Sequence, residues 1–265
     1  MTIQEIQKVD LTSFCYLNKE RYPFLLESVN HNENNRYSIL FAFPEKSIVL
    51  RDFSDFDFLN ELESHCKQKS HDLNLPFTGG WFIYLSYELI GQIEPTLASK
   101  LQKSNIPIAY AVKIPSAVIT DHKLEKTFIV DEDDDDTRIN QILSDMRALE
   151  NIPDETIDGE ISEENEKKFT DGVKSSLDYI VAGDVFQVNL SRKWSYSLNL
   201  KQDSATIYKK LKKANPAPFS ALVQYENFSI ISSSPERLFS VNDGTLETRP
   251  IAGTHPRGKG RLDDA

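Results

Sequence analysis

Residues 215–258 read NPAPFSALVQYENFSIISSSPERLFSVNDGTLETRPIAGTHPRG and carry more information about fold and function than any other part of this 265-residue chain. Two runs within them, Ser229–Ser233 and Glu236–Val241, have the composition of β-strands. The triplet Asn242–Asp243–Gly244 that follows is a turn signal. We therefore predict that this stretch forms strands joined by tight connections.

The chemistry of this stretch is concentrated in the run SSSPER, residues 232–237, where small hydroxyl groups surround the carboxylate of Glu236. A carboxyl group that is half-buried at the end of an apolar strand has a raised pKa and is suited to general acid catalysis. The alternative is an ordinary surface pair of Glu236 with Arg237. Composition alone favours that alternative.

The next segment, Glu247–Thr254, combines a rigid proline, a glycine, a guanidinium group and hydroxyl groups. Glycine allows a ligand to approach the backbone closely, and arginine binds carboxylates in a bidentate manner. These residues predict anion binding, without indicating a reaction.

The region immediately upstream alternates helix and strand signals. Val185–Arg192 alternates in the manner of a strand, with the polar side chains of Gln187 and Asn189 on one face. A helix is predicted from Ser162 to Gly183, and a second helix is predicted over Asp203–Ala214. The first helix has a stripe that we expect to be buried, formed by Phe169, Val173, Leu177 and Ile180.

The first half of the chain mixes short β-rich runs with helix signals. The runs are 36–43 and 109–119, and one helix is expected after a cap at Ser54, with Phe58, Leu59, Leu62 and Cys66 on one face. Another helix is predicted over 139–149, and the acidic run 131–136 is expected to be a solvated loop. The polar stretch 151–160 indicates a boundary near residue 155.

Composition excludes several classes of protein. With 39% hydrophobic residues the chain can bury a sizeable core, and its net charge of −11 argues against a nucleic-acid partner. The sequence contains neither a leader-like start nor an apolar run long enough for a membrane span, so we expect a cytoplasmic protein without a membrane partner. Cys15 and Cys66 lack metal-ligand spacing and are expected to be packed, reduced thiols.

Four motifs in order over residues 183–258, VFQVNLSR, NPAPF, SSSPERL and ETRPIAGTHPRG, resemble component I of aminodeoxychorismate synthase and of anthranilate synthase. The resemblance extends upstream through PFLLES at 23–28, RYSI at 36–39 and TGGWFIYLSYEL at 78–89. The last of these, with AYAVKIPSAVITDH at 109–122, fits the aminodeoxychorismate branch better. The resemblance therefore covers most of the chain.

The resemblance implies an α+β fold of packed antiparallel β-sheets with flanking helices. It implies that residues 1–155 are the N-terminal region of this fold and that 156–265 are the first part of the chorismate-binding catalytic region. The implied reaction adds ammonia, supplied by a glutamine amidotransferase subunit, at C2 of chorismate while the C4 hydroxyl leaves. The product is 4-amino-4-deoxychorismate for folate synthesis, with anthranilate for tryptophan synthesis as the alternative. A third possibility is a non-catalytic binding module.

Individual roles carry over from the family to matching positions. Glu236 corresponds to the acid at the leaving hydroxyl, and Gln187 to the nucleophile-side position, which is lysine in relatives that add water. Ala252 stands where some aminodeoxychorismate synthases carry a lysine that attacks chorismate covalently, so alanine excludes that route at this site. Gly253 and Thr254 match positions that contact the substrate.

Two further strips match the tryptophan pocket of the family: Glu27 with Ser28, and Asn215, Pro216 and Phe219. The alternative is two packed loops that bind no ligand. Relatives continue beyond the position of Ala265 with the glutamates that bind magnesium, and His255 does not replace them. We therefore expect a C-terminally truncated, inactive portion of the fold, without metal ligands of its own.

Overall fold

The computed structural model describes residues 1–30, 35–66, 75–101, 104–133, 136–199, 202–242, 244–251 and 253. The chain forms two compact units, one of residues 1–153 with 204–265 and one of residues 154–203. The first unit thus contains both the beginning and the end of the chain. The predicted functional regions, residues 1–155 and 156–265, are not tested by this division into compact units and stay a prediction.

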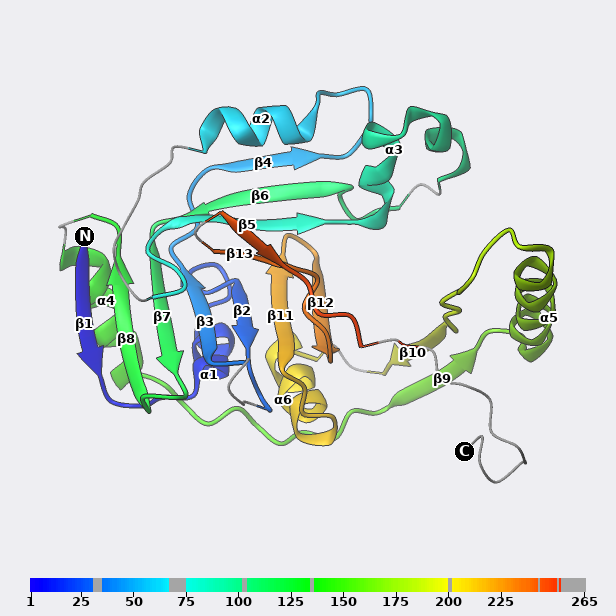
Figure 1. Ribbon diagram of the computed structural model, residues 1–265. Helices are drawn as coiled ribbons and strands as arrows, with labels where there is room; N and C mark the ends of the chain where they lie inside the picture. Colours follow the sequence, from blue (N-terminus) through cyan, green and yellow to red (C-terminus); the bar gives the residue numbers. More distant parts are fainter. Residues whose placement is uncertain are drawn as a thin grey trace. The chain divides into compact units, whose positions relative to one another are not determined.

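The first unit is built on a seven-stranded sheet in which all neighbouring strands are antiparallel (Figure 1). Its order is β1 (Thr2–Ile6), β8 (Lys126–Asp131), β7 (Ser116–Asp121), β3 (Tyr37–Ala42), β2 (Phe24–Glu27), β11 (Phe219–Tyr225) and β12 (Phe228–Ser234). Strand β11 joins the two ends of the chain, because Ser220 pairs with Glu27 and Val223 pairs with Phe24. The predicted packed antiparallel α+β fold is confirmed.

A three-stranded sheet packs on one face of this sheet, in the order β4 (Ser47–Leu50), β6 (Ala109–Ile114) and β5 (Gly80–Leu85). Its strands run across those of the larger sheet (Figure 1). Aromatic side chains fill the interface, and the rings of Phe24 and Phe82 stack with centroids 4.0 Å apart. The predicted strand over 109–119 is therefore two strands, because the chain passes from one sheet to the other at Pro115.

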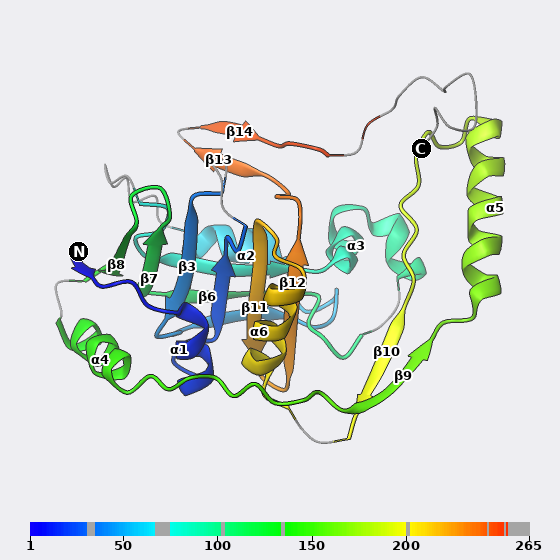
Figure 2. The ribbon, with the colours of Figure 1, turned by 90° about the horizontal axis from the view of Figure 1, so that it is seen from below.

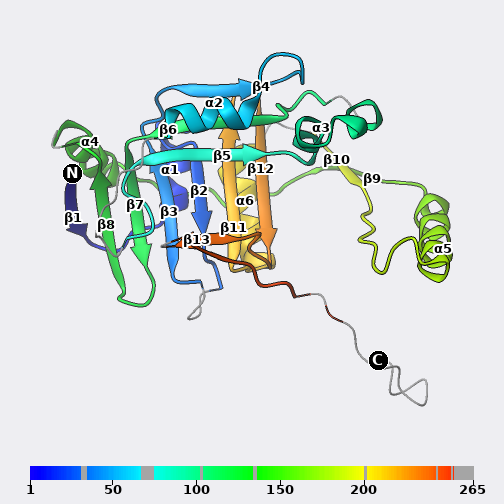
Figure 3. The same cartoon turned by 45° about the horizontal axis from the view of Figure 1, so that its top comes forward.

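Helix α2 (Phe58–His65) covers the outer face of the small sheet (Figure 3). Phe58 and Leu62 are buried there, but Leu59 and Cys66 are exposed, so the expectation of a packed thiol is confirmed for Cys15 and wrong for Cys66. The cap is Asp57, whose carboxylate accepts a hydrogen bond from the Asn60 amide, so the prediction of Ser54 as the cap was wrong. Short helical turns follow β5: Tyr87–Leu89, α3 (Ile90–Ile93) and Pro95–Lys100.

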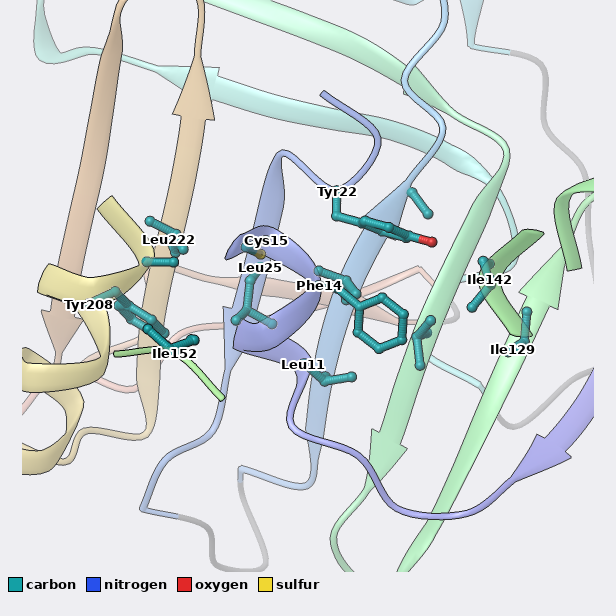
Figure 4. Close-up of a cluster of buried hydrophobic side chains, with 14 of the residues drawn as sticks. Leu11, Phe14, Cys15, Tyr22, Leu25, Ile129, Ile142, Ile152, Tyr208 and Leu222 are labelled. Atoms are coloured by element: carbon teal, nitrogen blue, oxygen red, sulfur yellow. The ribbon is translucent and has the colours of Figure 1, made fainter. Parts of the chain in front are cut away.

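Three helices cover the opposite face of the seven-stranded sheet: α1 (Leu11–Leu17), α4 (Asp136–Arg147) and α6 (Ser204–Ala214) (Figure 2). The largest core cluster lies between them and the sheet, and Figure 4 shows Phe14, Tyr22 and Tyr208 within it. Ile139 and Ile142 of α4 are buried, as their spacing predicts. Helical periodicity therefore located α4 and α6 correctly.

Two buried carboxylates anchor α4. Asp145 accepts hydrogen bonds from Tyr22 Oη at 2.6 Å and from Arg21 Nη1 at 2.5 Å. Asp131 has a side chain that is 0% exposed, and it accepts from Arg138 Nε at 2.7 Å, from Arg138 Nη2 at 3.0 Å and from the Ser116 hydroxyl. The acidic run is therefore not wholly a solvated loop, because its first residue ends the buried strand β8.

The second unit contains a ladder of β9 (Gly159–Glu163) with β10 (Trp194–Leu198), and helix α5 (Glu166–Ala182). Gly183 ends α5 with a φ of +84°, as predicted, but the helix begins after an Asn165 cap. Ser162 instead pairs with Ser195 in the ladder. None of the described side chains of α5 is buried, and Leu177 is 56% exposed, so the prediction of a buried stripe was wrong.

The predicted strand over residues 185–192 is also absent from the described part of the chain. These residues are irregular and exposed, and the strand of this region begins only at Trp194. A strand requires hydrogen bonds from a neighbour, and no described strand pairs with 185–192. The alternating polarity of the sequence does not show whether such a pairing strand is present.

No helix among the described residues is both long enough and apolar enough to cross a bilayer.

Candidate functional site

The motif segments after β12 fold back on one another. Strand β12 ends at Ser234, residues 235–239 are irregular, and a hairpin follows, formed by β13 (Ser240–Asn242) and β14 (Thr245–Glu247). Gly244 has a φ of +74° in the connection, as a turn at this position requires. The predicted strand over 236–241 is therefore shorter than expected and begins at Ser240.

This hairpin brings Glu236 to the segment that the sequence assigned to substrate binding. The backbone amide of Ile251 donates a hydrogen bond to Glu236 Oε1 at 3.2 Å. The Thr248 hydroxyl donates to the Leu238 carbonyl at 3.0 Å, and the Ser234 hydroxyl donates to the Glu236 carbonyl at 3.0 Å. The SSSPER and TRPIAG motifs thus meet at the Glu236 carboxylate.

Glu236 itself is exposed, so the expectation of a half-buried carboxylate is wrong for the described residues. The reason is its place in the fold, because β12 is the last strand of the described sheet and only β11 pairs with it. One oxygen accepts from Ile251, and the carboxylate is open to a ligand on the solvent side. Its role as an acid stays a prediction.

Arg237 does not pair with Glu236 as the surface alternative required. Its guanidinium lies 3.6 Å from Glu247 of β14 and 5.8 Å from the ring centroid of Phe219. The ion pair with Glu247 links the segment before β13 to the last residue of β14. Arg237 therefore holds the hairpin near the strand end, and it leaves the Glu236 carboxylate without a cationic partner among the described residues.

The substrate-binding positions are only partly described. Gly253 is exposed, and a β-carbon added there would meet no described atom beyond its chain neighbours within 4 Å. The described residues therefore give no steric reason for glycine at this position. Ala252 and Thr254 lie outside the described residues, as does His255, so their predicted roles stay predictions.

Gln187 belongs to the second compact unit, whereas Glu236 belongs to the first. Within its unit Gln187 is exposed, and its Nε2 donates a weak hydrogen bond to Asn189 Oδ1 at 3.4 Å. The two polar side chains that share a face in the sequence pattern are thus in contact. The predicted nucleophile-side role of Gln187 remains untested.

The two strips assigned to a tryptophan pocket do lie together. The amides of Val29 and Asn30, which follow Ser28, donate to the Ala217 carbonyl at 3.1 and 3.3 Å. The Ser233 hydroxyl donates to the Asn215 carbonyl at 2.5 Å and ties the second strip to β12. Asn215 and Pro216 are exposed and Phe219 is half-buried.

The polar groups of the first strip are already engaged within the chain. Glu27 Oε2 accepts from Tyr208 Oη at 2.8 Å and lies 3.2 Å from Lys212 Nζ. Ser28 is buried and its hydroxyl donates to the Tyr37 carbonyl at 2.9 Å. Burial, and then the neighbouring Glu27 carboxylate, raise the pKa of Tyr208 far above its ordinary value. Tryptophan binding therefore stays a prediction, and would require these bonds to rearrange.

Tyr208 and Lys212 are the residues here that sequence reasoning missed. They are four positions apart on α6 and therefore share a helix face. That spacing was a usable signal, but it could not identify Glu27, which is distant in sequence, as the common partner.

A metal site is not evident in the described part of the chain. No group of three or more histidine, cysteine, aspartate or glutamate side chains is arranged there to hold an ion. The described residues do not provide the carboxylate ligands that magnesium requires. We therefore derive no chemical step through magnesium, and its involvement stays an expectation.

Comparison with known proteins agrees with the motif pattern. A family model described as chorismate binding enzyme matches residues 21–265. Anthranilate synthase component 1 of Lactococcus lactis is 28% identical over 99% of this chain and 63% of the relative. Aminodeoxychorismate synthase component 1 of Bacillus subtilis is 30% identical over 92% of this chain and 57% of the relative.

Among solved structures, anthranilate synthase component I from Streptococcus pneumoniae matches with a TM-score of 0.65 at 24% identity. The match covers 82% of this chain and 54% of that structure, and at this identity it supports the fold alone. The chain thus spans about half to two-thirds of the length of these relatives.

Proposed function

The chain belongs to the family of chorismate-binding enzymes, and on that premise we propose that the complete protein catalyses the ammonia-dependent amination of chorismate. The observation that carries the proposal is the hydrogen bond from Ile251 to Glu236, which joins the SSSPER and TRPIAG motifs. It holds one oxygen of an otherwise open carboxylate beside a segment suited to binding an anionic substrate.

In the proposed reaction Glu236, in its acid form, protonates the C4 hydroxyl of chorismate, which leaves as water. Ammonia forms the new carbon–nitrogen bond, at C4 with no net shift of the ring double bonds or at C2 with such a shift, and the nitrogen then releases one proton, which restores the acid. Chorismate and ammonia thus give an amino product and water. This balance holds whether the nitrogen finally lies on C2 or on C4.

Ammonia, rather than water, is the proposed nucleophile because of Gln187. A neutral amide cannot deprotonate water, whereas ammonia is a sufficient nucleophile without a base. We propose that a glutamine amidotransferase subunit supplies the ammonia. Gln187 is exposed within its own unit, so its amide is accessible to a ligand.

We propose 4-amino-4-deoxychorismate as the product, in which the nitrogen finally lies on C4. Addition that ends at C2, as the resemblance implies, would lead to anthranilate. The N-terminal segments GGWFIYLSYEL and AYAVKIPSAVITDH support this branch. The second candidate is anthranilate, which requires amination at C2 instead of C4, followed by loss of pyruvate. The number of anthranilate synthases among the relatives supports that candidate.

The deciding experiment supplies the complete protein with chorismate, ammonium and magnesium and identifies the product by chromatography and mass spectrometry. We expect 4-aminobenzoate only when the lyase that aromatises 4-amino-4-deoxychorismate is added. Anthranilate without the lyase would assign the second candidate. No amino product, with chorismate still bound, would contradict the proposed function and support a binding module.

We also predict that no covalent adduct forms between chorismate and the protein. Neither Gln187 nor Ala252 carries an amine that could attack the substrate. Intact-mass spectrometry of the complete protein, quenched during turnover, should show the unmodified mass. The Ala252→Lys variant is the matched control because it restores the amine, and it should gain a chorismate-derived mass. An adduct on a lysine of the unmodified protein would contradict this prediction.

A further inference from the structure

An open cavity of about 360 Å³ lies in the first compact unit, away from Glu236, where α6 meets three connections of the seven-stranded sheet. The walls come from the segments after β1 and β2, the turn between β7 and β8, and the second half of α6. The ionisable or basic groups that line it are Lys8, Glu27, His122, Lys209, Lys212 and Lys213.

The balance of charge in this cavity is strongly positive. Lys212 neutralises Glu27, since its Nζ lies 3.2 Å from Oε2 and 3.3 Å from Oε1. Lys209 Nζ donates to the Ile152 carbonyl at 2.6 Å, which orients the ammonium group but leaves its charge uncompensated. Lys212 also lies 3.4 Å from Asp10 Oδ1, whereas Lys8, Lys209 and Lys213 line the cavity without an ion-pair partner among the described residues.

Helix electrostatics account for only part of this arrangement. Lys212 and Lys213 lie in the last turn of α6, where cations interact favourably with the helix dipole. Lys8 and His122 come from other elements and gain nothing from that dipole. Convergence of like charges is unfavourable unless an anion compensates them, and the chain as a whole is acidic, with a net charge of −11.

The lining residues also indicate which kind of anion fits. No arginine is among them, so the cavity lining has no planar guanidinium group to bind a carboxylate through two parallel hydrogen bonds. Lysine ammonium groups act as point charges and bind phosphate oxygens from several directions. His122 adds an imidazole whose Nε2 lies 2.8 Å from Ser38 Oγ, which fixes the ring.

We propose that this cavity binds the phosphate group of a small phosphorylated molecule, with Lys8, Lys209 and Lys213 as the charged contacts. The site is separate from the Glu236 segment, and the proposal does not depend on the proposed amination. It also gives Glu27 a role that differs from holding an amino acid: Glu27 accepts from the buried Tyr208 and positions Lys212 at the cavity wall.

The test uses inorganic phosphate as the probe and the complete protein without chorismate. Calorimetric titration at constant ionic strength should detect saturable phosphate binding, and Lys213→Glu and Lys8→Glu should each weaken it about tenfold or more, because each reverses a charge near the anion. Lys19→Glu is the matched control: it makes the same charge change at an exposed lysine of the same unit that does not line the cavity.

Three outcomes would overturn the proposal. Phosphate at high concentration strengthens burial in any protein, so an equal effect on all variants would identify a general salt effect. Malonate that binds as tightly as phosphate, with the same sensitivity to Lys8 and Lys213, would show that the cavity recognises carboxylates instead. Absence of saturable binding to the unmodified protein would remove the site altogether.

Discussion

Replacing Glu236 with glutamine should lower the turnover of chorismate by about 10²–10⁴-fold, the range expected when a general acid is lost. Glutamine has nearly the same shape and can still accept the hydrogen bond from the Ile251 amide, so the segment should keep its conformation. It cannot protonate the departing hydroxyl. Binding of chorismate, measured by equilibrium titration in the complete protein, should therefore change little.

The matched control for this variant is Glu63→Gln. Glu63 is an exposed carboxylate on helix α2 of the same unit and lies outside the motif segments of the site. We expect turnover in this control to stay within a few-fold of the unmodified protein. If the two variants lose activity equally, or if Glu236→Gln retains normal turnover, Glu236 is not the acid.

The second large effect is on stability, at the ion pair of Asp131 with Arg138. Arg138→Met keeps the aliphatic stem but leaves the carboxylate of Asp131, which is 0% exposed, without its cation. Removing one partner of a buried pair destabilises a protein by about 3 kcal/mol or more. Urea denaturation should show this loss, whereas Arg147→Met, at an exposed position of the same helix, should change the free energy of unfolding little.

The pH dependence of this effect has a definite sign. Burial alone raises the pKa of the Asp131 carboxyl, but hydrogen bonds from Arg138 and Ser116 outweigh burial and hold that pKa below its usual value. The pair therefore stabilises the fold above the unfolded-state pKa of about 4 and loses this contribution as the pH falls through the folded-state pKa. In Arg138→Met, burial dominates and the folded-state pKa should rise.

The stability difference between the unmodified protein and Arg138→Met should consequently narrow as the pH falls from 7 towards about 4. Adding Asp131→Asn to Arg138→Met removes the uncompensated charge and should recover part of the lost stability at pH 7. A difference that stays constant over this pH range, or a double variant no more stable than the single one, would show that Arg138 acts through packing alone.

The features that could be predicted from the sequence are local ones. Helical spacing located α4 and α6, and the glycine at 183 identified the end of α5, because these signals depend on neighbours in the chain. The motif order also predicted which segments belong to a site. The hydrogen bond between Ile251 and Glu236 then joined two of those segments in space.

The features that could not be predicted depend on partners distant in sequence. The strand expected over 185–192 has no pairing strand among the described residues, and the apolar stripe of α5 has no covering surface among them. The amphipathic pattern predicts that a face can be buried, but it does not say what buries it. The lysine-lined cavity was missed for the same reason, because its walls come from four separate segments.

The position of β11 between β2 and β12 has a consequence for how the protein is made. A ribosome releases β2 long before β11, and the stretch between residues 27 and 219 takes roughly 10–40 s to synthesise at about 5–20 residues per second. During that time the backbone groups of Phe24–Glu27 that later pair with β11 remain an open edge. Open strand edges can pair with other chains. Until β11 is synthesised, the edge of β2 is therefore a specific site at which the nascent protein needs protection by chaperones.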